Sequence, residues 1–333
     1  MKRRKRVLII HTGGTLGMLP RGQGFTRDLP RLVPELGVLA DVQVESPFLI
    51  DSSSTTPEHW QSLARLVAGQ MPDFDGFVIT HGTDTMAYTA SALSFMLRNL
   101  RKPVVLTGAQ RPLMEVRNDA RSNLLDAVEV ATRRVPEVVI CFGGLVLRGN
   151  RARKRSLHDL RAFESPNHPG LGEVGVTLRL HRERFLAPRG RFSLHSRLDR
   201  RVVHVRLSPG FGSALLGLDV PEVKGVVLEA FGAGNLPLGK DSPVSTLMEM
   251  RKRGIPVVLV SGSEHGGVDL SLYEGGRAAR RAGAISGGDM TGEAAVVKLM
   301  LALGQEEGLD RIRSFMETPL AGEREAGVRR APR

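Results

Sequence analysis

Residues 7–15 read Val-Leu-Ile-Ile-His-Thr-Gly-Gly-Thr, and this stretch decides the fold. Its first four residues form a short apolar run, rich in β-branched side chains, of the kind that becomes a buried strand. The Thr-Gly-Gly-Thr that follows predicts a tight turn, because glycine adopts backbone conformations that are closed to other residues. A buried strand that ends in a polar turn is typical of an α/β sheet, in which ligands bind beyond the carboxyl ends of the strands.

The same pattern recurs through the first half of the chain. Three further apolar runs are predicted to be buried strands: residues 76–80, 104–107 and 138–142. Three stretches between them place apolar residues at helical spacing: residues 57–71, 84–97 and 118–132. This alternation of strands and helices predicts an α/β fold with a mostly parallel sheet.

The second half predicts a separate, smaller α/β unit. From residue 178 to 207 the periodicity is lost, and one strand is expected there, at 202–207. Strands are then expected at 225–228 and 256–260, and helices at 242–253 and 294–303. We therefore predict an N-terminal catalytic domain at 1–186, a linker at 187–209 and a C-terminal domain at 210–333. The tail after Ala321 is expected to fray.

The composition excludes several classes of protein. The chain has 333 residues, of which 41% are hydrophobic, enough for two ordinary domains with real cores. Cys141 is the single cysteine, which excludes a disulfide framework and a cysteine-rich zinc site. No apolar run approaches the ~20 residues of a membrane span, and the run after the basic N-terminus is too short for a signal peptide. We expect a cytoplasmic protein with no membrane partner.

The net charge of +12 is concentrated in arginine-rich segments at 2–6, 148–155 and 179–206. A basic excess can indicate a nucleic-acid partner. Aromatic residues make up only 5% of the chain, however, and none are interleaved with the arginines. We therefore interpret these segments as solvated surface charge rather than as a nucleic-acid interface.

The segments that follow the predicted strands carry the polar chemistry. Because the carboxyl ends of parallel strands meet at one edge, these segments are expected to converge. They are residues 11–17, 51–54, 81–85, 108–112 and the 148–154 cluster, and together they supply hydroxyls, a carboxylate, glycine-freed N–H groups and a lysine.

This set of groups suits acyl transfer. A threonine hydroxyl can act as a nucleophile when another group takes its proton, and glycine-rich turns can direct N–H groups at an oxyanion. A lysine amine can accept a proton, which arginine cannot, and Lys154 is such a lysine, although it could equally be a surface cation. The Thr-Gly-Gly-Thr turn could also cradle a phosphate or be purely structural, but neither the dinucleotide-binding nor the P-loop pattern is present.

Two motifs in the expected order resemble the L-asparaginase family of bacterial amidohydrolases. They are Thr12-Gly13-Gly14-Thr15 and His81-Gly82-Thr83-Asp84-Thr85. Further stretches resemble its cytoplasmic type I branch: Asp51-Ser52-Ser53, Leu106-Thr107-Gly108-Ala109-Gln110, Arg148-Gly149-Asn150-Arg151 and Gly287-Gly288-Asp289-Met290-Thr291. The resemblance runs from about residue 7 to 304. It implies a flavodoxin-like (Rossmann-like) N-terminal domain, a smaller α/β C-terminal domain, and dimers or tetramers whose sites a neighbouring subunit completes.

The resemblance also implies roles for single residues. The nucleophile matches Thr15, a second essential threonine matches Thr83, and the lysine that activates this second threonine matches Lys154. Asp84 matches the carboxylate that holds the substrate ammonium. The groups that hold the substrate carboxylate match Ser52 and Ser53, and the N–H groups of Gly14 and Thr83 are candidate oxyanion donors.

One position departs from the family pattern. The family carries a tyrosine on a mobile loop after the first motif, and Phe25 stands in its place here, without a hydroxyl. Gly22-Gln23-Gly24 is still interpreted as the hinge of a lid. We hypothesise that Tyr273, at a type I position that reaches a neighbouring subunit's site, supplies the missing hydroxyl.

The sequence thus predicts an enzyme of asparagine catabolism that hydrolyses L-asparagine to L-aspartate and ammonia through a threonyl acyl-enzyme. No cofactor or metal is expected, and the partners expected are the substrate and further copies of the chain. A glutaminase, an ammonia-releasing amidotransferase subunit and a weakly active asparagine sensor remain as alternatives. The amidotransferase subunit usually has an extra N-terminal domain, which is not expected here because the first motif begins at residue 12.

Overall fold

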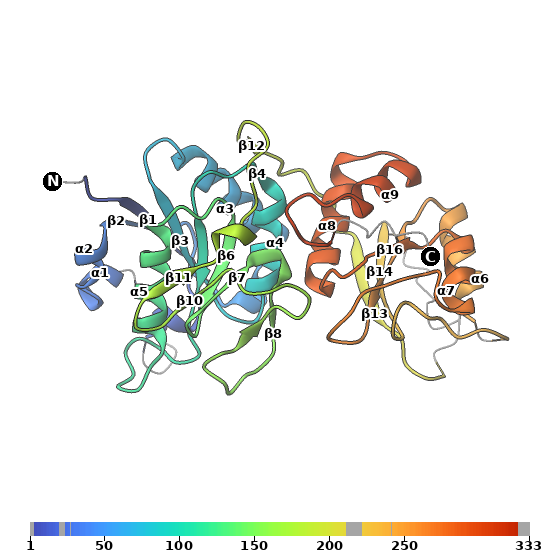
Figure 1. Ribbon diagram of the computed structural model, residues 1–333, viewed down its shortest axis with the longest axis horizontal. Coiled ribbons are helices and arrows are strands. Elements are labelled where there is room, and N and C mark those ends of the chain that lie inside the picture. The colour runs from blue at the N-terminus through green and yellow to red at the C-terminus, as the bar shows by residue number, and fades with distance from the viewer. Residues whose placement is uncertain (1–2, 20–23, 27, 211–221, 241, 326–333) are drawn as a thin grey trace. The chain divides into compact units, whose positions relative to one another are not determined.

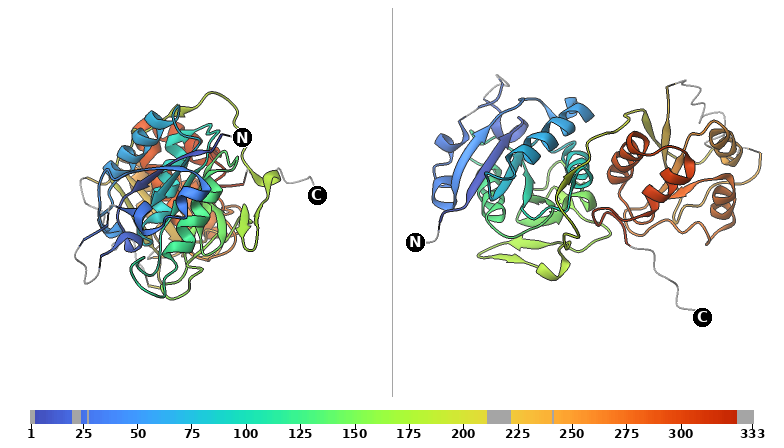
Figure 2. Two further views of the ribbon diagram at one scale, coloured as in Figure 1. Left: turned by 90° about the vertical axis from the view of Figure 1, so that its left-hand side faces the viewer. Right: turned by 90° about the horizontal axis from the view of Figure 1, so that it is seen from above.

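The computed structural model describes residues 3–19, 24–26, 28–210, 222–240 and 242–325. The chain divides into two compact units, Met1–Ser196 and Arg197–Arg333. Each unit has its own β-sheet with helices packed against it (Figures 1 and 2). The predicted linker, residues 187–209, spans this division and contributes a short strand to each unit.

The first unit is built on an eight-stranded sheet in the order β11-β10-β7-β6-β5-β3-β1-β2. Five neighbouring strands are parallel: β2 (Asp41–Glu45), β1 (Arg6–His11), β3 (Gly76–Thr80), β5 (Val104–Thr107) and β6 (Val138–Phe142). Three antiparallel strands extend the sheet: β7 (Leu145–Arg148), β10 (Gly172–Val174) and β11 (Leu178–Leu180). The predicted parallel α/β sheet is confirmed, with an antiparallel addition at one side.

Helices cover the sheet because its central strands are apolar on both faces. Strands β3, β5 and β6 are buried throughout, as parallel strands with two covered faces are. The helices that cover them are α3 (Pro57–Gln70), α4 (Met86–Met96) and α5 (Ala120–Ala131), with the short α1 (Leu29–Leu32) and α2 (Leu36–Leu39) (Figure 1). Alternate strand residues such as Val7 and Ile9 share one core with α5.

Small elements connect the larger helices and strands of this unit. The described residues of the unit include the 3₁₀ turns η1 (Thr15–Gly17), η3 (Ser52–Ser54), η4 (Gly149–Arg151) and η5 (Arg182–Arg184). Strands β8 (Arg153–Lys154) and β9 (Phe163–Glu164) form a hairpin, and β4 (Leu97–Arg98) pairs with β12 (Ser193–Leu194). The hairpin formed by β8 and β9 carries Lys154, one of the predicted site residues.

The second unit is a four-stranded parallel sheet in the order β13-β14-β15-β16. Its strands are β13 (Val202–Arg206), β14 (Gly225–Ala230), β15 (Val257–Ser261) and β16 (Ile285–Ser286). Its helices are α6 (Val244–Lys252), α7 (Glu274–Ala282), α8 (Gly292–Gln305) and α9 (Leu309–Glu317). The smaller α/β unit is thus confirmed.

Two expectations from the sequence are corrected. The helix expected at 84–97 begins at Met86, which leaves Asp84 in the preceding loop, where its carboxylate is 60% exposed. The tail after Ala321 does not fray over its described part, because Glu323 is fully buried against Lys298. The Lys298 ammonium also donates to the carbonyls of Met316 and Thr318, and Glu323 accepts from the N–H groups of Leu320 and Ala321.

This buried ion pair gives a test of what holds the tail. Glu323→Gln leaves the Lys298 ammonium without its counter-charge in a fully buried site, so we expect the free energy of unfolding to fall by about 3–5 kcal/mol. The matched control is Glu249→Gln, whose exposed partner is Lys252, with an expected change within about 0.5 kcal/mol. Urea unfolding measures both, and equal effects of the two substitutions would contradict the assignment.

Candidate active site

The turn after β1 depends on two glycines. Gly13 and Gly14 have φ values of +101° and +72°, a region that side chains rarely adopt. A Cβ on Gly13 would lie 2.4 Å from the Ile50 carbonyl oxygen, and one on Gly14 would lie 2.4 Å from the Gly82 nitrogen. The absence of side chains therefore lets this turn press against the loops that follow β2 and β3.

The Gly14 amide is already used within the chain. Its N–H donates to the Ile50 carbonyl at 3.1 Å, and the Ile50 N–H donates to the Thr12 carbonyl at 3.0 Å. The Gly14 N–H therefore has an acceptor within the chain, and the oxyanion role expected for it remains a prediction. What the structure shows for Gly14 is close packing against the Gly82 backbone.

Thr15 starts the η1 turn directly beyond Gly14 and is half-buried. The chain then returns along η1: Phe25 pairs with Met18 in an antiparallel bridge, and the Thr26 N–H donates to the Gly17 carbonyl at 2.8 Å. Phe25 is half-buried and has no hydroxyl to offer. Of the predicted hinge, Gly24 is described, whereas Gly22 and Gln23 lie outside the described residues.

The loop after β2 presents the serines predicted to bind a carboxylate. Asp51 caps the η3 turn by accepting from the Ser53 hydroxyl at 2.6 Å and from its N–H at 2.8 Å. These two hydrogen bonds, the hydroxyl first, lower the pKa of the Asp51 carboxyl. Ser52 is buried, and its carbonyl accepts from the Thr85 hydroxyl at 2.7 Å. This loop is thereby fixed to the one that follows β3.

Lys154 joins the two other predicted catalytic groups. Its ammonium donates to the Thr83 hydroxyl at 2.7 Å and to Asp84 Oδ1 at 2.7 Å. The Lys154 side chain is only 15% exposed, whereas that of Asp84 is 60% exposed. The structure thus brings Thr83, Asp84 and Lys154 into one hydrogen-bonded group, with the carboxylate open to solvent for a ligand.

A buried chain of polar side chains supports the loop that carries Thr83. His81 lies between the Gly82 carbonyl, 2.7 Å from Nδ1, and the Thr89 hydroxyl, 3.0 Å from Nε2. The indole N–H of Trp60 donates to the same hydroxyl at 3.0 Å. Burial lowers the pKa of His81 to about 4, so the ring is neutral near pH 7. These contacts give His81 a structural, hydrogen-bonding role in this loop.

One supporting cluster was missed by the sequence analysis. Asp119, just before α5, accepts from the N–H groups of Gln110 and Arg111 and from the Asn123 amide. Asn123 in turn donates to the Gly108 carbonyl and accepts from the Gly143 N–H, both at 3.0 Å. Asp119 and Asn123 are 5% and 2% exposed. The available signal was a pair of polar residues four apart on the buried side of a predicted helix.

Tyr273 belongs to the second unit. It precedes α7 as its N-cap residue and is 50% exposed. The role proposed for its hydroxyl in a neighbouring subunit's site therefore remains a prediction, and the first unit alone supplies Thr15, Ser52, Ser53, Thr83, Asp84 and Lys154.

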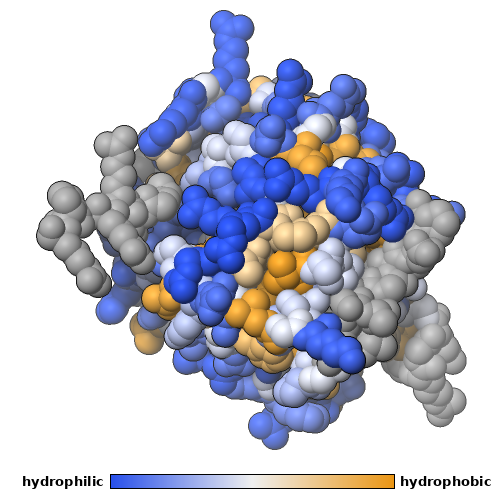
Figure 3. Space-filling model, turned by 90° about the vertical axis from the view of Figure 1, so that its right-hand side faces the viewer, coloured by the Kyte–Doolittle hydropathy of each residue, from blue (hydrophilic) through white to orange (hydrophobic). Residues whose placement is uncertain are grey.

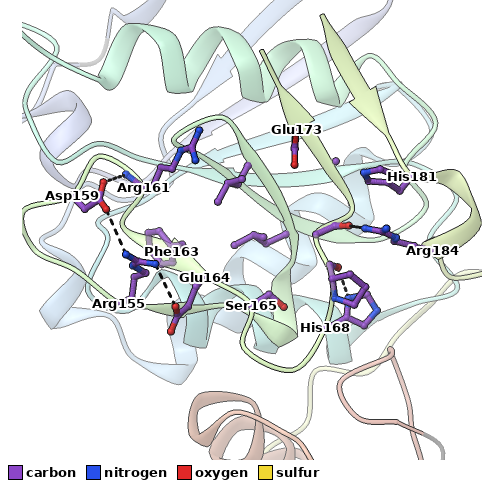
Figure 4. A pocket seen from close by; sticks show the side chains of 15 residues that line it. Arg155, Asp159, Arg161, Phe163, Glu164, Ser165, His168, Glu173, His181 and Arg184 are labelled. Carbon is purple, nitrogen blue, oxygen red and sulfur yellow. Dashed lines mark hydrogen bonds and ion pairs between the residues drawn. The ribbon is translucent and has the colours of Figure 1, made fainter. Parts of the chain in front are cut away.

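A cavity of about 520 Å³ lies beside the hairpin formed by β8 and β9 (Figure 4). Arg155 forms ion pairs there with Asp159 at 3.7 Å and with Glu164 at 3.8 Å. Neither Lys154 nor Thr83 lines this cavity, so it is separate from the candidate active site. Among the described residues, no group of three or more His, Cys, Asp and Glu side chains is placed to hold a metal ion.

Hydroxyl, ammonium and carboxylate groups at the carboxyl edge of a parallel α/β sheet are the chemical groups of an amide-hydrolysing enzyme. Comparison with known proteins makes the class more specific. Residues 6–186 match the model of the asparaginase N-terminal domain, and residues 201–316 match that of the glutaminase/asparaginase C-terminal domain. The chain belongs to the asparaginase family.

Individual relatives match this chain over nearly its whole length. The chain is 39% identical to L-asparaginase 1 of Escherichia coli over 332 residues, which cover 96% of this chain and 98% of that protein. The solved thermostable L-asparaginase from Thermococcus kodakarensis superposes with a TM-score of 0.91 at 36% identity, covering 97% of this chain and all of that one. A probable cytoplasmic L-asparaginase from Campylobacter jejuni gives a TM-score of 0.78 at 29% identity, covering 94% and 99% of the two chains.

The close packing at Gly14 leads to a prediction. Gly14→Ala places a Cβ against the Gly82 backbone in a conformation that only glycine tolerates, so we expect about 1–3 kcal/mol of lost stability. Displacement of Thr15 should also lower kcat by about 10²-fold. In the control Gly37→Ala, nothing lies within 4 Å of the added Cβ, and the helix should gain roughly 0.5–1 kcal/mol. Thermal melts and turnover measure both, and a fully active Gly14→Ala would refute the argument.

The buried His81 predicts a pH dependence of stability. Its folded pKa of about 4 lies below the unfolded value of 6.5, so between these pH values the unfolded chain binds a proton that the folded chain does not. Stability is therefore lost as the pH falls from 6.5 towards 4, by up to about 3 kcal/mol. In His81→Gln this part of the slope should disappear, whereas in His158→Gln, where an exposed ring is replaced, the slope should persist. Urea unfolding at stepped pH measures the slopes, and equal slopes would contradict the prediction.

Proposed function

We propose that this protein hydrolyses L-asparagine to L-aspartate and ammonia, with Thr15 as the nucleophile. The observation that carries the proposal is the contact of Lys154 with both Thr83 and Asp84 at 2.7 Å. This group stands at the carboxyl edge of the sheet, beside the turn that holds Thr15. Membership of the asparaginase family and the names of its relatives support the same reaction.

Substrate binding follows from the charges at the site. Lys154 occupies Oδ1 of Asp84, which leaves the second carboxylate oxygen to receive the α-ammonium of the substrate as a charge-assisted hydrogen bond. Ser52 and Ser53 on the η3 turn receive the α-carboxylate. Together they fix an α-amino acid at both of its charged groups and direct its side-chain amide towards Thr15.

The reaction has two steps. The Thr15 hydroxyl oxygen attacks the amide carbon and gives up its proton, which leaves with the amide nitrogen as ammonia, and a threonyl ester remains. Water then attacks the ester and returns the proton to Thr15 as aspartate is released. The Thr83 N–H is the proposed oxyanion donor. Lys154 acts in this step as the neutral amine, which accepts the proton of the attacking water through the Thr83 hydroxyl and then returns it.

The hydroxyl that Phe25 lacks is proposed to come from Tyr273 of a neighbouring copy, so a homodimer or homotetramer is part of this proposal. Exposed apolar side chains in the second unit support it, Phe231, Leu238, Leu272 and Tyr273 among them. Apolar groups also gather within hydrophilic surroundings on the face of this unit in Figure 3. Such exposure is typical of a surface that another chain covers.

We also propose that the protein acts in the cytoplasm. The Campylobacter jejuni relative, itself described as probably cytoplasmic, supports this location. No helix among the described residues has the length and apolar character to cross a bilayer.

Ammonia release from L-asparagine and L-glutamine tests the proposal. We expect Thr15→Ala and Thr83→Ala each to lower kcat by roughly 10³-fold or more, because each removes a group of the reacting centre. The control Thr132→Ala, where a hydroxyl is lost at the end of α5, should retain full activity. Full turnover by Thr15→Ala would overturn the assignment of Thr15 as the nucleophile. If the wild type showed no turnover but asparagine still raised its Tm, the protein would instead be a sensor. Faster turnover of glutamine than of asparagine would indicate a glutaminase.

A further inference from the structure

We infer that Gln110 is a positioning residue for Lys154, and that Asp119 and Asn123 hold it in place. The inference rests on the proposed role of Lys154 and adds residues that do not touch the substrate. Lys154 lies on a two-residue strand that pairs with Phe163 of β9, so its backbone position depends on this pairing and on the loop that joins β8 to β9. What holds this loop therefore helps to determine where the ammonium lies.

The Gln110 side chain contacts this loop directly. Its amide Nε2 donates to the carbonyl of Ser156 at 3.3 Å and to that of Asp159 at 3.4 Å. Inside the loop, the Ser156 hydroxyl accepts from the N–H groups of His158 and Asp159 at 3.1 and 2.9 Å. The loop is thus a compact turn that one glutamine contacts at two carbonyls.

A second contact comes from Gly143, at φ +57°. A Cβ there would lie 2.5 Å from the Leu160 carbonyl oxygen, so the bare backbone at this position packs tightly on the same loop. The Gly143 N–H donates to Asn123 Oδ1 at 3.0 Å. Two separate segments, that of Gln110 after β5 and that of Gly143 after β6, therefore contact the loop that follows Lys154.

Both segments are held by the start of α5. The Asp119 carboxylate accepts from the Gln110 N–H at 3.0 Å and from the Arg111 N–H at 2.9 Å, while Asn123 fixes Gly143 and is itself bonded to Asp119 at 3.1 Å. Because the Asp119 carboxylate and the Asn123 amide are almost fully buried, water cannot replace these hydrogen-bond partners. Asp119 and Asn123 thus hold the segments of Gln110 and Gly143 in place. These two segments contact the loop, and the loop positions Lys154.

The ion pairs of Arg155 hold the same loop less firmly than Gln110 does. The contacts of Arg155 with Asp159 and Glu164 seen in Figure 4 are long, at 3.7 and 3.8 Å, and the Arg155 side chain is 51% exposed. Exposed pairs of this kind contribute little energy. Loss of Gln110 should therefore disturb this loop more than loss of Arg155.

A double-mutant cycle tests the inference. Gln110→Ala in the wild-type background should lower kcat about 10-fold with KM changed less than about twofold, because the ammonium moves while the substrate contacts stay. In the Lys154→Met background, with residual turnover followed over long incubations, the same change should alter kcat less than about twofold. Gln110→Glu keeps the length but places carboxylate oxygens against carbonyls, so it should be no more active than Gln110→Ala.

The control is Gln61→Ala, which removes a glutamine that likewise donates to a backbone carbonyl, that of Ser196 at 2.8 Å, from helix α3. It should leave kcat unchanged. An equal loss from Gln110→Ala in both backgrounds, or a lowered Tm with unchanged kcat, would overturn the inference and leave Gln110 a structural residue. Full activity of Lys154→Met alone would instead overturn the proposed function of Lys154, so the two failures are distinguishable.

Discussion

The close approach of two backbone segments, Gly14 against Gly82, is the constraint on which the site depends. A side chain at Gly14 would meet the Gly82 nitrogen at 2.4 Å, and one at Gly82 would meet the Ser52 hydroxyl at 2.5 Å. Glycine at both positions lets three loops, from β1, β2 and β3, touch one another. The hydroxyls of Thr15 and Thr83 come from two of these loops, so neither could be placed by its own strand alone.

How much of this could be predicted from the sequence follows from burial. Strands β3, β5 and β6 and helices α3 and α5 were predicted closely, because continuous apolar runs and a 3.6-residue period reflect the burial of strands and of helix faces. The antiparallel strands β10 and β11 were missed. They have three residues each and are partly exposed, so they leave no hydrophobic period that the sequence could show.

At the site, local sequence patterns identified the residues but not the contacts that they make with residues distant in the chain. The motif residues were found because they follow strands, but the use of their atoms depends on partners far along the chain. The Gly14 N–H donates to the carbonyl of Ile50, a partner that no local pattern indicates. Lys154 looked like one cation in a basic segment, and only its contact with Thr83 and Asp84 separates it from its arginine neighbours.

In the proposed mechanism, Lys154 couples recognition to chemistry. Its ammonium is shared between a carboxylate that is 60% exposed and a nearly buried hydroxyl, so one group links the substrate-binding surface to the interior. A ligand ammonium arriving at Asp84 would stand beside that of Lys154, and repulsion between like charges would weaken the hold of Asp84 on the lysine. A ligand without an α-ammonium would leave Lys154 paired with Asp84. The same carboxylate can therefore select α-amino acids and adjust the group that acts on Thr83, provided the hairpin keeps Lys154 within reach of both.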